Sequence, residues 1–259
     1  MIKVAIVAQK GGDGKTTTAH ALGAGLARYH EKKVLYIDMD AQGNLSRTLE
    51  ADQSGQAPSV LEILTGEISA VDAIQHTGGG DVISASPLLA GADREEALSN
   101  VGREYRLRKA LEPLAEAYDY CVIDTPPALG ILTVNALTAA DLVLIPAQAD
   151  DYSLDAVEKL SATIETVRQY CNPALKVSGI LLTRYNGRTN VTSYLDELIT
   201  EVADRIGARM YRSRIRECAY IKEAKALRSD IFTHSPRCIA AQDYKRFIDE
   251  FMEGDQDHE

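Results

Sequence analysis

The alternation of short apolar runs with longer helical patterns restricts the fold of this chain more than any other feature of its sequence. The apolar runs are rich in β-branched residues and almost uninterrupted in hydrophobicity, which is typical of strands that are covered on both faces. The predicted strands span residues 2–8, 33–40, 81–86, 118–126, 141–147 and 176–183, and the predicted helices span residues 16–30, 93–117, 131–139 and 152–170. This order predicts an α/β fold with a single doubly wound, mostly parallel sheet flanked by helices. The functional loops of such a sheet follow the carboxyl ends of its strands.

The length of the chain fits one large α/β domain. Its 259 residues lie within the size range of a single domain, and we expect residues 1–259 to form it. Segments 52–59 and 77–81 have the composition of surface loops within that domain. The acidic end of the chain, residues 252–259, is expected to be frayed.

Several features predict a cytoplasmic protein. No apolar run approaches the roughly 20 residues that a membrane-spanning helix needs. The chain begins directly with a strand-like run, which leaves no room for a signal peptide. Its four cysteines form no CxxC pair, so we expect reduced thiols rather than disulfides or metal ligands.

The charge of the chain is unevenly distributed. A formal net charge of −10 and an isoelectric point near 5.1 argue against a general nucleic-acid or membrane binder. Residues 184–246, however, carry 13 Lys and Arg against 8 Asp and Glu. A basic patch on an acidic body and a solvated face with a few extra arginines both fit this distribution.

The strongest functional signal is the stretch VAQKGGDGKTTTAH, residues 7–20, which joins the first predicted strand to the first predicted helix. Glycines let backbone N–H groups turn towards phosphates without a Cβ clash, and the helix adds its positive dipole end. Lys15 can reach the β- and γ-phosphates of a nucleotide, and the Thr16 hydroxyl can bind Mg²⁺. A glycine turn that merely precedes a helix is the alternative, and the flanking strand with Lys15 and Thr16 argues against it. The predicted nucleotide-binding residues of this loop are Gly11, Gly12, Asp13, Gly14, Lys15, Thr16 and Thr17.

Three aspartates at the ends of predicted strands belong to the same candidate site. Asp38 and Asp40 are two residues apart and therefore point to the same side of a strand end. Asp38 can hold a Mg²⁺-bound water, and Asp40 can orient a water for attack beside the γ-phosphate. Asp124 ends the apolar run CVID before two prolines, which is the pattern of a magnesium-binding aspartate. Thr16, Asp38 and Asp124 are thus the predicted metal-binding residues.

The motifs KGGDGKTT, DMDAQGNLS and DTPPALG, in this order and at this spacing, resemble those of the deviant Walker A ATPases of the ParA/MinD group. The segments IPAQADDYSLDAVEKL and LLTRYNGRTN make the chain most similar to the ParA/Soj type of DNA-partition ATPase. With no N-terminal helix-turn-helix extension, it resembles the short ParA class. The similarity extends from Ile2 to about Phe251. It implies a P-loop NTPase fold and slow, Mg²⁺-dependent hydrolysis of ATP.

The resemblance also implies a homodimer that forms with ATP. In this family the lysine before the glycines crosses a nucleotide-sandwich dimer to touch the ATP of the partner, so Lys10 is expected to act in trans, as an arginine finger does. Dimerisation then depends on the nucleotide state. Lys10, Lys15 and Asp40 are the implied catalytic residues, and Arg184, within LLTRYN, is assigned to the nucleotide site.

The family binds DNA without sequence preference, and a ParB-like centromere-binding protein stimulates hydrolysis. We therefore expect a nucleoid-associated, ATP-bound form of this chain. Here the chain departs from the usual family sequence IPRNVRLSEAPSHGKP, because Arg216 replaces a proline and Tyr220 stands where an arginine is expected. The basic patch is therefore either redistributed or used for a partner protein. The candidate DNA-binding residues are Arg188, Arg212, Arg214, Arg216, Lys222, Lys225 and Arg228.

Three other functions share parts of this pattern. A MinD-like membrane ATPase needs a basic amphipathic C-terminal helix, whereas this chain ends in an acidic tail. A nitrogenase-type iron protein needs cysteines in loops that bridge a cluster, and none of the four cysteines lies in such a loop. A weakly hydrolysing, nucleotide-dependent regulatory dimer that binds DNA stays open because of Asp13, whose carboxylate is unfavourable beside phosphates. We expect this side chain to point away from them, accept a loop N–H or pair with a lysine.

Overall fold

The computed structural model describes residues 1–94, 101–186 and 190–256. Its eight strands form one sheet in the order β3-β4-β2-β5-β1-β6-β7-β8, with every neighbouring pair parallel except β3 and β4. The strands are β1 (Ile2–Ile6), β2 (Val34–Asp38), β3 (Gln75–Thr77), β4 (Gly80–Ile83), β5 (Tyr120–Asp124), β6 (Leu142–Ala147), β7 (Lys176–Tyr185) and β8 (Met210–Arg216). The predicted doubly wound, mostly parallel sheet is confirmed.

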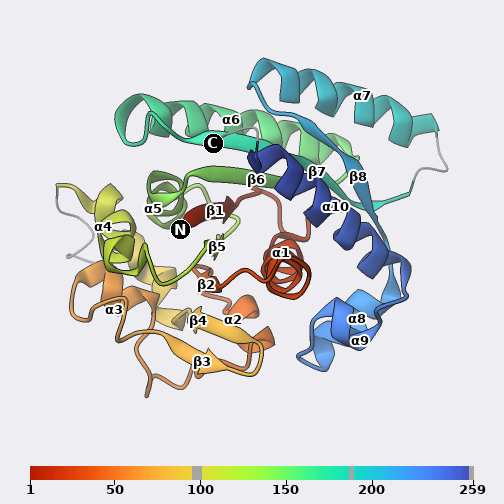
Figure 1. The fold of residues 1–259 in the computed structure, drawn as a ribbon. Coiled ribbons are helices and arrows are strands. Elements are labelled where there is room, and N and C mark those ends of the chain that lie inside the picture. Colours follow the sequence, from red (N-terminus) through yellow and green to blue (C-terminus); the bar gives the residue numbers. More distant parts are fainter. Residues whose placement is uncertain (95–100, 187–189, 257–259) are drawn as a thin grey trace.

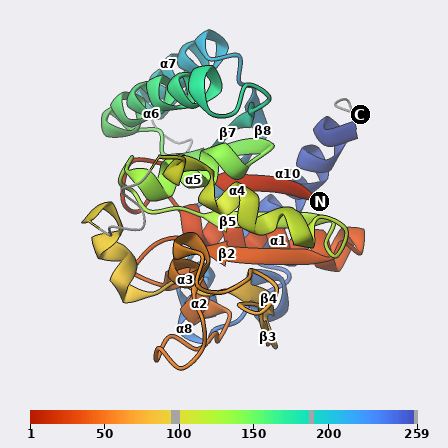
Figure 2. The ribbon, with the colours of Figure 1, turned by 90° about the vertical axis from the view of Figure 1, so that its left-hand side faces the viewer.

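Helices cover both faces of this sheet (Figure 1). The helices are α1 (Lys15–His30), α2 (Asn44–Thr48), α3 (Val60–Thr65), α4 (Arg106–Leu111), α5 (Ile131–Ala139), α6 (Asp151–Tyr170), α7 (Asn190–Arg205), α8 (Ala219–Ala226), α9 (Ile231–His234) and α10 (Ile239–Gln256). Figure 2 shows α6 and α7 beyond the β7 side of the sheet and α3 at the end that carries β3 and β4. Within the described ranges, no helix has both the length and the apolar character needed to cross a bilayer.

Two apolar clusters, one on each face of the sheet, explain the uninterrupted hydrophobicity of the strands. Alternate residues of β1 point to opposite faces: Ala5 packs in the cluster that α5 and α6 cover, whereas Val4 and Ile6 pack in the cluster that α1 and α10 cover. All five residues of β2 and all five of β5 are buried. A strand buried on both faces has no polar side, so its sequence shows no alternation.

Two sequence predictions of local structure are wrong. The helix predicted over 93–117 is interrupted: Gly102 has a φ of 83°, and the short 3₁₀ segments η3 (Arg103–Tyr105) and η4 (Glu112–Leu114) flank α4. Part of the loop predicted at 77–81 is a hairpin, since Thr77 ends β3 and Gly80 begins β4.

The end of the described chain forms the last turns of α10. Fraying was expected from residue 252, but α10 continues to Gln256, and the Tyr120 hydroxyl contacts the Met252 sulfur at 3.5 Å. The apolar face of α10, with Phe247, Ile248 and Phe251, is buried. This packing stabilises the last turns of the helix despite their acidic composition, and residues 257–259 lie outside the described part.

Close packing of α1 on β2 requires a glycine in the middle of the helix. A Cβ added at Gly23 would lie 2.4 Å from the ring of Tyr36, which is itself buried and donates a hydrogen bond to the His20 carbonyl at 3.3 Å. The ring therefore cannot move aside cheaply. Gly23 sets the distance between α1 and β2, and with it the position of the loop that precedes α1.

We expect Gly23→Ala to lower the melting temperature. Overpacking costs about 1–3 kcal/mol, and the better helix propensity of alanine offsets up to about 1 kcal/mol of this. Gly78→Ala is the matched control, because nothing lies within 4 Å of its added Cβ. Thermal unfolding of the two variants checks the prediction, and equal melting temperatures would contradict the packing argument.

Candidate nucleotide-binding site

The order of the strands brings the predicted site residues to one edge of the sheet. β5 lies between β2 and β1, with Asp124 paired in register with Asp38 on one side and with Ile6 on the other. The loop after β1 therefore starts beside the two aspartates. The carboxyl end of β6, on the other side of β1, contributes the segment that begins at Gln148.

Two glycines in the loop after β1 adopt left-handed backbone conformations. Gly12 has a φ of 97° and Gly14 a φ of 82°, a region that other residues rarely enter. Gly14 caps α1 without a side-chain hydrogen bond, and the first turn of α1 contains no acidic residue. The free N–H groups and the positive end of the helix dipole thus face the loop, as an anion site requires.

Lys15, the first residue of α1, lies largely inside the protein. Its side chain is 7% exposed, and its Nζ donates to the Lys10 carbonyl at 3.1 Å. Burial lowers the pKa of Lys15, while Asp124, Asp13 and Asp40 act in the opposite direction. A buried ammonium surrounded by carboxylates is well placed to bind the phosphates of a nucleotide.

Asp38 and Asp40 have different surroundings. Asp38 is fully buried and accepts hydrogen bonds from the Ser46 N–H and hydroxyl, both at 2.8 Å, and from the Asp40 N–H at 3.1 Å. Burial raises the pKa of Asp38 to about 6. The half-buried Asp40 uses one oxygen to accept from the Gln42 N–H at 3.0 Å, which leaves its other oxygen for a water.

Asp124 carries a buried carboxylate without a hydrogen-bond partner among the described residues, on either oxygen. Burial, and then the neighbouring Asp38, raise the pKa of Asp124, whereas the nearby Thr16 and Lys15 lower it. An unpaired buried carboxylate is costly. A cation beside it would remove that cost.

This donor set fits Mg²⁺. The described residues contain no group of three or more His, Cys, Asp or Glu side chains arranged to hold a metal ion. Mg²⁺ does not need such a group, because it usually keeps several waters and is bound by one or two carboxylates together with substrate phosphates. Thr16, Asp38 and Asp124 meet this requirement at the edge where the phosphates would lie, and their metal-binding role stays a prediction.

Asp13 is turned into the protein. Its side chain is 2% exposed, accepts a hydrogen bond from the Gln148 amide at 3.0 Å and lies 3.8 Å from the Lys10 Nζ. Burial, as the largest effect, raises the pKa of Asp13 to about 6, although Lys10 and Gln148 act against it. The pairing with a lysine agrees with the sequence expectation, whereas the bond from Gln148 was not anticipated.

Lys10 contacts residues of its own chain in this structure. Its Nζ donates to Asp150 Oδ2 at 2.5 Å and lies 5.9 Å from the ring centroid of Tyr152. Asp150 caps α6, where it also accepts a hydrogen bond from the Ser153 N–H at 2.8 Å. The predicted action of Lys10 on a partner subunit stays a prediction.

A cavity of about 200 Å³ extends from the glycine loop towards β8 and α8. Gly12, Gly14 and Thr17 line it on one side, and Arg184 lies at its wall with an ion pair to Glu217 at 3.2 Å. Its size and its position beside the loop suit the nucleoside part of a nucleotide. Three candidate DNA-binding residues, Arg216, Lys222 and Lys225, also line this cavity. Sequence reasoning did not single out the remaining lining residues: Thr183, Ile215, Glu217, Cys218, Ile221 and Tyr244.

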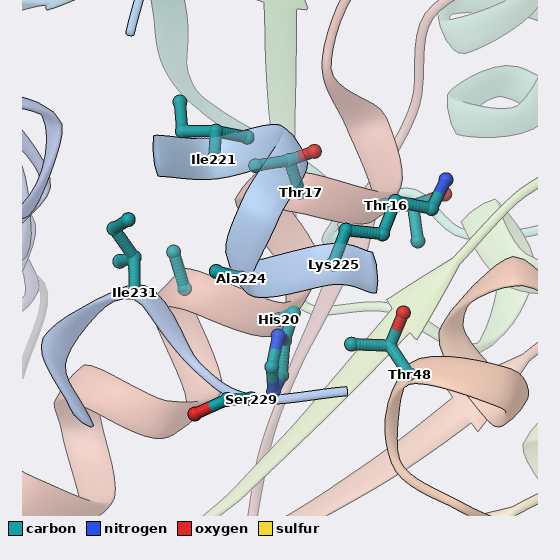
Figure 3. A pocket seen from close by; sticks show the side chains of 10 residues that line it. Thr16, Thr17, His20, Thr48, Ile221, Ala224, Lys225, Ser229 and Ile231 are labelled. Carbon is teal, nitrogen blue, oxygen red and sulfur yellow. The ribbon is translucent and has the colours of Figure 1, made fainter. Parts of the chain in front are cut away.

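A second, smaller pocket lies between α1, α2 and α8 (Figure 3). Lys225 extends from α8 towards Thr16 of α1, and its Nζ lies 3.5 Å from Asn44 Oδ1. Thr17 and Ile221 line both pockets. The structure thus places Lys225, a candidate DNA-binding residue, beside the candidate nucleotide site.

The other candidate DNA-binding residues are divided between β8 and α8. Arg212 and Lys222 are exposed, and Arg228 forms a 3.9 Å ion pair with Glu50. Arg216 is held by the fully buried Asp243, at 2.7 Å, and so has a structural partner within the chain. The Arg214 guanidinium donates to the Tyr211 carbonyl, and Arg188 lies outside the described residues.

Sequence reasoning also missed Gln148, Asp150 and Ser46. Asp150 stands directly before a helical pattern, which is a recognisable N-cap signal. Its contact with Lys10, 140 residues away in the chain, depends on β6 lying next to β1. No local pattern reveals that neighbourhood.

The comparison with protein families gives a match to the AAA domain family over residues 1–177. Among curated relatives, the sporulation initiation inhibitor protein Soj of Bacillus subtilis is 39% identical over 243 residues, covering 93% of this chain and 94% of the relative. The chromosome partitioning protein ParA of Caulobacter vibrioides is 36% identical over 260 residues, covering 99% and 96%.

Solved structures with the same fold contain nucleotides. The cobyrinic acid a,c-diamide synthase from Mycobacterium smegmatis with bound ADP and magnesium has a TM-score of 0.84 at 32% identity, covering 100% of this chain and 97% of the other. A Cyanothece McdA variant in complex with ATP has a TM-score of 0.87 at 26% identity, covering 98% and 96%. The sequence prediction of ATP and Mg²⁺ agrees with these ligands.

We expect Asp13→Asn to stabilise the protein above pH 6 and to have little effect below pH 4. The folded-state pKa of Asp13, about 6, exceeds its ordinary value of 3.8, so the folded form binds the proton more tightly and loses stability as pH rises through this window. This difference of about two in the pKa corresponds to at most about 3 kcal/mol of free energy of unfolding. Melting temperatures of both forms at pH 4, 6 and 8 check this, and a difference independent of pH would contradict it.

Proposed function

We propose that this chain, which belongs to the ParA/Soj family of partition ATPases, is a slow, Mg²⁺-dependent ATPase whose ATP-bound dimer coats DNA and moves a DNA cargo. The observation that carries the proposal is that three features lie together at one edge of the sheet. They are Lys10, the glycine loop and the Asp124 carboxylate, which has no hydrogen-bond partner among the described residues. The full-length similarity to proteins named Soj and ParA supports it.

Each residue of the site has a separate task in this proposal. The loop N–H groups and Lys15 bind the phosphates, while Thr16, Asp38 and Asp124 hold Mg²⁺ directly or through water. Mg²⁺, when bound, neutralises charge on the phosphate oxygens. Asp40 orients the attacking water with the carboxylate oxygen that Gln42 does not engage.

Dimerisation and release follow from the position of ATP between two subunits. Lys10 of each chain contacts the phosphates on its partner, so that the dimer persists only while ATP is intact. A ParB-like centromere-binding protein stimulates hydrolysis and so releases the chain from DNA. The exposed Arg212 and Lys222 are suited to phosphate contacts without base recognition.

A MinD-like membrane ATPase is the less favoured alternative. That function needs an amphipathic C-terminal helix that is free to lie on a bilayer. In this chain the apolar face of α10 is buried against β8 and α1. Releasing it would expose the Phe247 and Phe251 rings and open the core.

We expect Asp40→Ala to slow hydrolysis about a hundredfold or more, because a positioned carboxylate contributes roughly this factor, and to leave an ATP-bound dimer on DNA. Phosphate release and retention on immobilised duplex measure both effects. Asp72→Ala, at an exposed position outside the site, serves as the control. Hydrolysis at the normal rate in Asp40→Ala would remove Asp40 from the mechanism.

We expect Lys10→Ala to weaken ATP-dependent dimerisation about tenfold or more, because a charge-assisted contact to phosphate is lost across the interface. Light scattering with and without ATP measures the dimer. Lys33→Ala removes an exposed lysine at the opposite edge of the sheet and should dimerise normally. A dimer of unchanged affinity in Lys10→Ala would disprove the action in trans.

Binding to random duplex DNA should require ATP and fall steeply with salt. If about four phosphates are neutralised, the affinity should drop about a hundredfold between 50 and 200 mM salt. Arg212→Glu, at an exposed position away from the candidate nucleotide cavity, should weaken binding, while Lys33→Glu should not. DNA binding and ATPase rate, measured with ATP, ADP or neither, test the proposal, and the absence of an ATP-dependent complex at low salt would refute it.

A further inference from the structure

Lys10 is enclosed by groups of its own chain. Its ammonium lies 2.5 Å from Asp150 Oδ2 and 3.8 Å from Asp13 Oδ1, and the exposed ring of Tyr152 lies 5.9 Å away. The side chain is 28% exposed. A lysine whose expected partner is on another subunit is thus already paired within the chain.

The two carboxylates that pair with Lys10 are each held by further hydrogen bonds within the chain. Asp13 is 2% exposed, its carboxylate is held by Gln148, and its backbone carbonyl accepts from the Thr183 hydroxyl at 2.8 Å. Asp150 is fixed as the cap of α6. Neither carboxylate can follow the ammonium outward, so the flexible lysine stem alone can move.

We propose that Asp13 is a positioning residue that, together with Asp150, holds the Lys10 ammonium against its own subunit and so opposes the ATP-dependent assembly in which Lys10 acts. This inference rests on the proposed function.

The opposition follows from competition for one ammonium group. Lys10 cannot remain on Asp13 and Asp150 while it binds phosphates on a partner, so each assembly event includes the breaking of this contact. A carboxylate that stabilises only the unassembled form lowers the population able to assemble. Removing the charge of Asp13 therefore lowers the ATP concentration that assembly needs.

A simpler role for Asp13, direct repulsion of the nucleotide, predicts a different outcome when Lys10 is removed. The charged groups that act on it are Lys10, Asp150 and Lys15, and its carboxylate could repel the phosphates directly, without Lys10. In that case the effect of losing the charge would persist when Lys10 is absent. Lys10→Ala thus separates the two roles.

The first experiment measures the state of Lys10 without nucleotide. An amine-acetylating reagent is applied to the nucleotide-free chain, and acetylation of Lys10 is followed by mass spectrometry. In Asp13→Asn the rate should rise about three- to tenfold, because the Asp13 carboxylate helps to hold the Lys10 ammonium within the chain and shields it from the reagent. Glu116→Gln removes an equal charge at an exposed position and should leave the rate unchanged; an unchanged rate in Asp13→Asn overturns the proposal.

The second experiment measures assembly by light scattering in an ATP titration. Asp13→Asn should lower the ATP concentration for half-maximal assembly about fivefold, and the substitution should have no such effect in a Lys10→Ala background. An equal effect in both backgrounds, or weaker assembly in Asp13→Asn, overturns the proposal. Asp13→Val provides a second uncharged variant if Asp13→Asn does not fold.

The two readouts separate failure of this inference from failure of the proposed function. If the wild-type chain does not assemble with ATP, the proposed function fails, but faster acetylation of Lys10 in Asp13→Asn still supports the contact. If the wild-type chain assembles and both readouts are insensitive to Asp13, only the positioning role fails.

Discussion

The parallel register of β2, β5 and β1 places Asp124 beside Asp38 and next to the loop that follows β1. This arrangement buries two carboxylates and the Lys15 ammonium within one edge of the sheet. Burial of like charges is unfavourable unless cations and hydrogen bonds compensate for it. Asp38 accepts hydrogen bonds from Ser46 and Asp40, whereas Asp124 has no hydrogen-bond partner among the described residues, and the nearby Lys15 and Thr16 offset its burial only in part. A cation beside Asp124 would offset this burial further, which suits the predicted binding of Mg²⁺ together with a polyphosphate.

The same edge connects the nucleotide loop to elements that are distant in sequence. Gln148 and Asp150 follow β6, Thr183 belongs to β7, and all three contact the segment from Lys10 to Asp13 through hydrogen bonds. The loop is thus held by residues at the ends of two further strands. Such contacts limit the conformations of the loop. They also connect its charged groups to the start of α6 through the pair of Lys10 and Asp150. A nucleotide that draws Lys10 away would alter this whole group of contacts, which is the physical basis for a switch.

The basic residues of the C-terminal part illustrate how charge in a sequence differs from charge at a surface. Arg216 is held within the fold by Asp243, a carboxylate that it shares with Arg246, and Lys225 is directed towards α1 and the nucleotide side. Arg212 and Lys222 keep exposed side chains. The excess positive charge of residues 184–246 therefore does not form one continuous group of free cations among the described residues, and each arginine or lysine needs its own test for DNA binding.

The sequence alone determined the fold class, the six central strands, and the glycine loop with the lysine and aspartates of the candidate site. These are local patterns, since strand hydrophobicity, glycine spacing and a terminal Asp depend on neighbours within about ten residues. It misjudged the segment 93–117, in which Gly102 has a left-handed backbone and short 3₁₀ segments flank α4. The last turns of α10 are stabilised by packing against distant strands, which no local pattern indicates. Only the tertiary structure decided that Asp13 turns inward to Gln148 and Lys10, that Lys10 pairs with Asp150, and that Asp124 is left without a partner. The physical reason is the strand order, which makes neighbours of β1, β5 and β6 although more than a hundred residues separate β1 from the other two.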